Sequence, residues 1–227
     1  MPRTLDPVAH ALRRDAFVDT AVRLIQTKGY EQMSIQDVLD ELDTSRGAFY
    51  HYFDSKVALL EAVVERIVEV ATAELAPVAD DPDRSALQKL EGVFGGLARW
   101  KAERKELMLA LMRVWLSDEN AIMREKSRQL TAIRLAPVLA KIVRQGNAEG
   151  VFRTGSAEHA AGVLVSLVLG ANEMASRLFV AFQAGAISFE NVERTLLAYV
   201  EAFERVLGLA PGSWPVDYTG ILREWFA

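Results

Sequence analysis

The stretch SIQDVLDELDTSRGAFYHYFDSK, residues 34–56, decides the fold class of this chain. Its first apolar residues recur at helical spacing between Ile35 and Leu42, which predicts a short helix with one buried face. Ser34 can accept a hydrogen bond from the free amides at the start of that helix, and Asp37 occupies the reciprocal position of a capping box. The stretch therefore opens with a short capped helix.

The same stretch continues through a tight turn into a second helix. Asp43 ends the first helix, because aspartate tolerates the left-handed backbone of a tight turn better than most residues. The second helix begins near Thr44 or Ser45 and buries Phe49 and Phe53, which lie one turn apart. A helix, a turn of three or four residues and another helix form a helix-turn-helix unit.

Composition limits the class of protein. The 227 residues can bury a full core, and 51% of them are apolar, which indicates extensive burial within or between protomers. The absence of cysteine excludes disulfides, thiol catalysis and cysteine zinc sites. The first residues lack the apolar segment of a signal peptide, and the longest apolar-or-small run, 160–171, is shorter than the roughly 18 residues that span a bilayer. We expect a soluble cytoplasmic protein that contacts no membrane.

Charge alone does not indicate a nucleic-acid partner. The net charge is −5, and residues 1–56 hold seven Lys or Arg against nine Asp or Glu. The placement of the basic groups, rather than their number, must then provide any attraction to phosphate. Arg3, Arg13 and Arg14 are candidates at the start of the chain, although solvated surface arginines are an equally good interpretation of each.

Helical periodicity continues through the rest of the chain, and no strand-like alternation exceeds a few residues. The first helix starts near Pro7, runs to about Lys28 and ends at Gly29 as a C-cap glycine. A helix capped by Asp54 runs to about residue 76, and the polar segment 77–84 follows it as a loop. Further helices are expected near 85–103, 105–116, 119–146, 156–184 and 188–208, with Pro137 kinking or splitting the third of these, and a short last helix within 210–227.

The run from Phe17 to Val64 resembles the DNA-binding domain of TetR-family transcriptional regulators. Three segments carry the resemblance in fixed order, namely GYEQMSIQDVL, SRGAFYHYFDSK and VALLEAVV. The resemblance implies an all-α protein with a helix-turn-helix DNA-binding domain at 1–56. The helix from 54 to about 76 joins it to a helical ligand-binding and dimerisation domain at 57–227.

The resemblance also assigns roles within the helix-turn-helix. It places the second helix of the unit in the major groove, where its N-terminal residues meet base edges. The base-reading set is Thr44, Ser45 and Arg46, and the arginine can pair with guanine O6 and N7 for roughly 1–3 kcal/mol of discrimination. Gly47 lets the backbone approach DNA. The expected phosphate contacts are Ser34, Gln36, Tyr50, His51 and Lys56.

Some of these positions have other interpretations or depart from the family pattern. His51 is equally well a solvated side chain, and Tyr52 could contact DNA or pack on the first helix. The family often has glycine where this chain has Asp43, and threonine or a similar residue where it has Ala48. Both departures bear on the operator sequence more than on DNA binding.

For the rest of the chain the resemblance implies a homodimer, and two late helices support one. The first carries small residues at every fourth position, and the second carries an apolar stripe. Two such helices from each protomer would form a four-helix bundle, whereas burial of both within one chain is the alternative. The predicted interface residues are Gly162, Ser166, Gly170, Val192, Leu196, Tyr199 and Phe203.

The resemblance further implies a small-molecule pocket with apolar walls and a few convergent polar groups. Methionine and tryptophan at helical spacing are also typical of an ordinary core, and the polar candidates could belong to a surface or interface patch. The predicted pocket residues are Trp100, Met108, Met112, Trp115, Met123, Asn172, Glu173, Met174, Arg177 and Phe179.

These features predict a homodimeric, ligand-responsive transcriptional regulator, a repressor rather than an activator. It would bind a palindromic double-stranded DNA operator and be released by a small apolar or amphipathic effector. The alternatives are a helical small-molecule-binding protein and an activator-type regulator with altered DNA binding. No enzyme, cofactor or metal is expected, because the three histidines lie far apart and no His-Glu-x-x-His, Gly-x-Ser-x-Gly or phosphate-binding glycine loop occurs.

Overall fold

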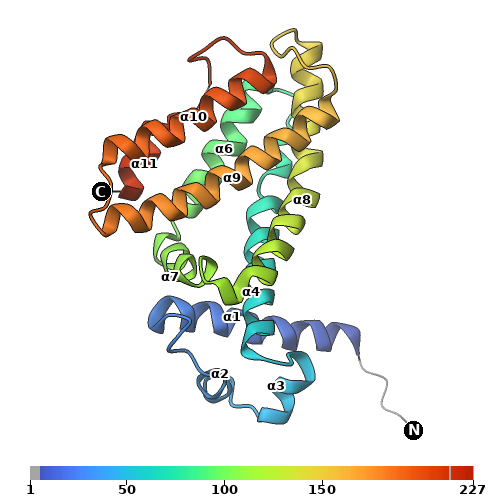
Figure 1. Cartoon of the computed structure of the whole chain (residues 1–227). Helices are drawn as coiled ribbons and strands as arrows, with labels where there is room; N and C mark the ends of the chain where they lie inside the picture. The colour runs from blue at the N-terminus through green and yellow to red at the C-terminus, as the bar shows by residue number, and fades with distance from the viewer. Residues whose placement is uncertain (1–5, 215, 227) are drawn as a thin grey trace. The chain divides into compact units, whose positions relative to one another are not determined.

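The computed structural model describes residues 6–214 and 216–226, so the predicted contact of Arg3 lies outside the described residues. Every regular element within these ranges is a helix (Figure 1), which confirms the all-α fold. The helices are α1 (Pro7–Lys28), α2 (Ile35–Glu41), α3 (Arg46–Tyr52), α4 (Lys56–Ala73), α5 (Ala76–Asp80), α6 (Ala86–Ala102), α7 (Lys105–Trp115), α8 (Ala121–Ala148), α9 (Ala157–Gln183), α10 (Phe189–Leu207) and α11 (Tyr218–Phe226), with a 3-10 turn at Asp118–Asn120.

The chain divides into two compact units that alternate along the sequence. Unit 1 comprises Met1–Glu69 and Lys105–Ser127, and unit 2 comprises Val70–Arg104 and Arg128–Ala227. α7 therefore belongs to the same compact unit as the N-terminal helices. The functional boundary predicted between residues 56 and 57 stays a prediction.

One apolar core holds unit 1 together. Phe17 of α1, Phe49 of α3 and Leu59 of α4 are completely buried, and α7 contributes further apolar side chains to the same cluster. The ring of Phe17 meets those of Phe49 and Phe53 edge-on, at centroid distances of 5.7 and 6.0 Å. The core assignment of Phe49 in α3 and of Phe53, which directly follows α3, is confirmed. Each buried aromatic side chain contributes roughly 1.5–3 kcal/mol by leaving water.

Unit 2 has two apolar clusters along the pair α9 and α10, which lie side by side (Figure 1). The larger cluster joins them to α6 and α8 and includes Leu164 and Phe203. The smaller cluster surrounds Leu178 and receives Leu222 and Phe226 from α11. The apolar tail therefore forms a packed last helix, as its composition predicted.

The ends of α4 and the course of α8 differ from expectation. Ser55, not Asp54, caps α4, since its Oγ accepts the N–H of Ala58 at 3.0 Å. The helix stops at Ala73, and Pro77 lies in the first turn of α5, where a missing N–H costs nothing. α8 is not split at Pro137, because the helix continues through this exposed position, where water can solvate the freed carbonyl. The other expectation, a kink at Pro137, stays a prediction.

α9 is more apolar over its length than the run 160–171 suggested. By length and composition it could cross a membrane, with a mean hydropathy of 1.5 over 18 residues, but 22% of that window is already buried inside the chain. A single helix of this kind is weak support for a membrane span. It does require a covering surface for its exposed apolar face.

Candidate nucleic-acid interface

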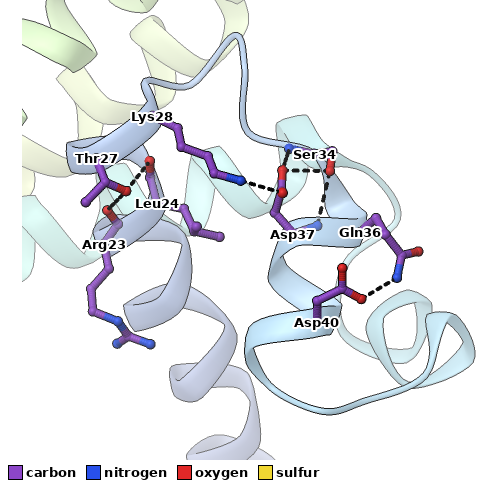
Figure 2. Close-up of polar contacts among 8 residues, drawn as sticks. All are labelled: Arg23, Leu24, Thr27, Lys28, Ser34, Gln36, Asp37 and Asp40. Carbon is purple, nitrogen blue, oxygen red and sulfur yellow. Dashed lines mark hydrogen bonds and ion pairs between the residues drawn. The ribbon is translucent and has the colours of Figure 1, made fainter.

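The entry into α2 is fixed by reciprocal hydrogen bonds (Figure 2). The Oγ of Ser34 accepts the N–H of Asp37 at 3.1 Å, and the Asp37 carboxylate accepts the N–H of Ser34 at 2.8 Å. This is the capping box that the sequence predicted. It fixes the start of α2 and leaves Ser34 on the surface.

A lysine of α1 reinforces the same corner. The Nζ of Lys28 donates to Asp37 Oδ1 at 2.6 Å (Figure 2). This bond, followed by those from Ser34, holds the pKa of the Asp37 carboxyl well below its usual range. The carboxylate is therefore charged at neutral pH and ties α1 to α2.

The turn into α3 has the geometry that its residues predicted. Asp43 adopts a positive φ of 45°, and the N–H of Thr44 donates to the carbonyl of Leu39 at 3.0 Å. Ser45 then caps α3 by accepting the N–H of Ala48 at 3.2 Å. Both short helices thus begin at a serine cap.

The residues predicted to read bases lie on the surface of unit 1. Ser45, Arg46 and Gly47 are exposed and Thr44 is half-buried. Within the described ranges, no carboxylate pairs with the Arg46 guanidinium. An unpaired arginine in the first turn of an exposed helix can donate two parallel hydrogen bonds to a planar acceptor such as guanine.

The remaining α3 side chains divide between surface and interior. Tyr50 and His51 are exposed, as a phosphate contact requires. Tyr52 packs on α1, with its ring 4.7 Å from that of His10 and 5.6 Å from that of Phe17. His10 also lies 5.6 Å from His51. Sequence spacing gave no signal for His10, because its neighbours come from another helix.

Two predicted phosphate contacts already have partners within unit 1. Gln36 Nε2 donates to Asp40 at 2.7 Å (Figure 2). Lys56 Nζ donates to the carbonyl of Glu31 at 3.3 Å and lies 4.2 Å from the centroid of the Tyr30 ring, and burial lowers its pKa. Contact with phosphate would require these groups to share or exchange partners, so their roles stay predictions.

The predicted pocket residues belong to both units, and each group is described within its own unit. Met108, Trp115 and Met123 belong to the core of unit 1, and Met112 lies on the same α7. In unit 2, Asn172 accepts a hydrogen bond from Lys101 and Glu173 pairs with Arg128 and Arg177. Met174 and Phe179 pack in the smaller cluster of unit 2. Of the ten, Trp100 alone lines the cleft found in the described part of unit 2.

The predicted dimer residues fall into three groups. Gly162 and Ser166 are exposed on α9, and Gly170 lies against the half-buried Tyr199 of α10 within the same chain. The assignment of the other three to a dimer interface is corrected. Their side chains pack inside one chain, with exposed fractions of 0% for Val192, 5% for Leu196 and 1% for Phe203, and so offer almost no surface to a partner.

Residues 17–63 match the family model described as bacterial regulatory proteins, tetR family. Within this segment the chain is thus similar to the regulators of that family. An uncharacterized HTH-type transcriptional regulator of Lactococcus lactis is 33% identical to it over 92 residues, which cover 40% of this chain and 47% of that protein. The HTH-type transcriptional regulator EthR of Mycolicibacterium smegmatis is 26% identical over 144 residues, covering 56% of this chain and 66% of that one.

The matches span about half to two thirds of the length of these two curated relatives. Among solved structures, a TetR transcription regulator from Haloarcula marismortui shares the fold with a TM-score of 0.61. It is 24% identical, and the match covers 85% of this chain and 98% of that one. The fold likeness thus extends well beyond the helix-turn-helix.

Proposed function

We propose that this chain is a DNA-binding transcriptional regulator of the TetR family that acts as a homodimer on a palindromic operator. The observation that carries the proposal is the start of α3, where a serine-capped helix presents an exposed Arg46 without an ion-pair partner in the described structure. Because the base-reading residues project from a buried aromatic core, the unit can present them rigidly.

In the proposed complex α3 lies in the major groove and α2 crosses the phosphate backbone. A groove about 12 Å wide admits one helix, whose first turn meets the base edges. Arg46 selects guanine, and the N-terminus of α2 with Ser34 faces phosphate. Asp43 adds a negative charge near the backbone, which weakens binding and makes it depend on the exact placement of the cations.

The exposed apolar face of α9 supports the homodimer. Val163 and Val180 of α9 are 48% and 47% exposed, and Leu197 of α10 is 36% exposed. The small residues Gly162 and Ser166 lie on the exposed surface of the same helix and would let a partner helix approach closely. In our proposal a second copy of the chain covers this face. Because the face is then covered, the protein needs no membrane partner and works in the cytoplasm.

The proposed response to an effector depends on the spacing of the two α3 helices in the dimer. Two α3 helices must be about one DNA turn apart, roughly 34–36 Å, to enter successive grooves. A small molecule that binds unit 2 better at another spacing releases the operator. We propose this as repression relieved by an effector. An activator would instead bind its operator more tightly with ligand.

Selection from a random double-stranded DNA library tests the DNA-binding proposal without knowledge of the operator. The selected sites should be palindromic, and their affinity should fall steeply with salt. Arg46→Glu should abolish selection, while Arg144→Glu, a charge reversal at a surface arginine of unit 2, should leave it unchanged. Failure to enrich any sequence at low salt would favour the alternative of a helical small-molecule-binding protein.

A further inference from the structure

Unit 2 contains a cleft of about 180 Å³ whose walls come from the end of α4, α5 and α6. Leu75, Val78 and Leu97 give it an apolar lining, and Glu74, Arg84 and Arg99 add charged groups. Apolar walls with a few charged groups are the usual make-up of a small-molecule site.

Two glycines of α6, one turn apart, shape this cleft. A Cβ on Gly92 would lie 2.6 Å from Cγ1 of Val78, so close packing of α5 explains the first glycine. A Cβ on Gly96 would meet nothing within 4 Å. Glycine destabilises a helix interior relative to alanine, and packing within the chain does not explain Gly96. Its missing side chain leaves space in the cleft.

Trp100 lines the same cleft and carries an unsatisfied donor. Its side chain is 6% exposed, and its buried Nε1 finds no acceptor among the described residues. The Arg104 guanidinium lies 4.5 Å from the centroid of the indole ring and holds the ring in place. A buried N–H without an acceptor is costly, so the Trp100 N–H favours a ligand whose oxygen reaches it from the cleft.

The charged groups of the cleft define the ligand further. Arg84 donates to Asp81 at 2.9 Å, whereas Arg99 has no ion-pair partner within the described part of the chain. Arg99 is therefore free to bind an anion, and the Glu74 carboxylate can accept a hydrogen bond from a hydroxyl group.

We propose that this cleft binds a monocyclic aromatic carboxylate that carries a hydroxyl group. The ring packs on the apolar lining, the carboxylate pairs with Arg99 and accepts the Trp100 N–H, and the hydroxyl donates to Glu74. The volume is consistent with one ring, since a cavity of about 150 Å³ in another protein holds benzene. The role of this ligand as the effector rests on the proposed function, whereas its binding to the cleft does not.

Calorimetric titration of the full chain with 3-hydroxybenzoate tests the site. A Cβ at Gly96 meets no neighbour within 4 Å, so Gly96→Leu should occupy the space and weaken binding at least tenfold, with helix content preserved and the melting temperature preserved or raised. Glu91→Leu, which adds the same side chain at an exposed position of α6, should bind as the wild type does. Arg99→Gln should weaken 3-hydroxybenzoate and leave the neutral analogue 3-methylphenol unchanged.

Several outcomes would overturn the site: no binding by the wild type, equal binding by Gly96→Leu, or a matching loss in Glu91→Leu. Binding of 3-methylphenol as tight as that of the acid would overturn the role of Arg99. If a DNA site is selected but 3-hydroxybenzoate does not bind, the cleft proposal fails and the regulator proposal stands. If the acid binds and no DNA sequence is enriched, the cleft stands and the regulator proposal fails.

Discussion

Asp37 ties the start of α2 to α1, because it bonds Lys28 and both the N–H and the hydroxyl of Ser34. Its pKa in the folded chain is lowered from the usual value. A lowered pKa gives stability that is present above the unfolded value, about 3.9, and is lost as pH falls toward the folded value. Protonation of Asp37 should therefore lower the stability of the folded chain in acid.

Asp37→Asn should lower the free energy of unfolding at neutral pH, and the difference from wild type should shrink as pH falls from about 5 downward. Urea titrations at a series of pH values measure this difference. Lys28→Met serves as a partner variant, since it should remove a large part of the same pH dependence while keeping the carboxylate. A difference that is constant with pH would show that the charge of Asp37 has no part in it.

Asp43 occupies a left-handed conformation with φ of 45°. Asp43→Gly should raise the free energy of unfolding or leave it unchanged, because glycine adopts this conformation without a steric penalty. Asp43→Val should lower it by about 1–2 kcal/mol, since a β-branched residue tolerates positive φ poorly. Equal stability of the two variants in urea would contradict the assigned turn geometry.

Arg46 and Lys56 should differ in how they affect DNA binding. Arg46→Ala should cost roughly 1–3 kcal/mol on the preferred site and relax the preference at one base pair of each half-site. Lys56→Ala should weaken all sequences about equally and reduce the salt dependence. Binding titrations on a set of single-base variants distinguish the two, and a sequence-selective loss in Lys56→Ala would reverse the assignment.

At the residue scale, sequence reasoning succeeded where the interaction is local. The capping box at Ser34 and the serine cap of α3 involve residues three positions apart, so the spacing alone identifies them. The contacts of Lys28 with Asp37 and of Lys56 with Glu31 join residues nine and 25 positions apart. Periodicity carries no information about such pairs, so only the folded structure reveals them.

At the element scale, two prolines in helices should have opposite effects. Pro137 lies inside α8, where it removes a helical hydrogen bond at a cost of about 3 kcal/mol, offset by up to about 1 kcal/mol through the unfolded chain. Pro137→Ala should therefore raise the free energy of unfolding by about 2 kcal/mol. Pro77→Ala, in the first turn of α5, should lower it slightly, and urea unfolding of both variants measures the contrast.

Helix positions were predictable but their packing partners were not. The expected helix at 156–184 is observed as Ala157–Gln183 and that at 188–208 as Phe189–Leu207, because capping serines and apolar periodicity mark their ends. The stripe containing Val192 and Phe203 was assigned to a dimer partner and instead packs within the chain. An apolar stripe shows that a face is covered, but not by which helix.

At the scale of the whole molecule, the apolar content predicted extensive burial, and the chain still exposes an apolar face after folding. The methionines and tryptophan of α7 were candidates for a pocket, but Met108 and Trp115 pack on the core of unit 1. The alternation of the two units along the sequence depends on this long-range packing, which no local pattern specifies. The face of α9 that carries Val163 and Val180 is an exposed apolar surface that a partner can use.

Val163→Asp tests whether that face is the dimer interface. A carboxylate at the centre of an apolar contact loses its water without gaining a partner, so the variant should dissociate into monomers at concentrations where the wild type is dimeric, and its affinity for the selected DNA site should fall with it. Ile133→Asp, a change at an exposed residue of α8 (72% exposed), should leave both properties unchanged. Sedimentation velocity gives the mass of each variant. If Val163→Asp stayed dimeric, or if Ile133→Asp alone dissociated, the two α3 helices would have to be brought to successive grooves by a different face of the chain.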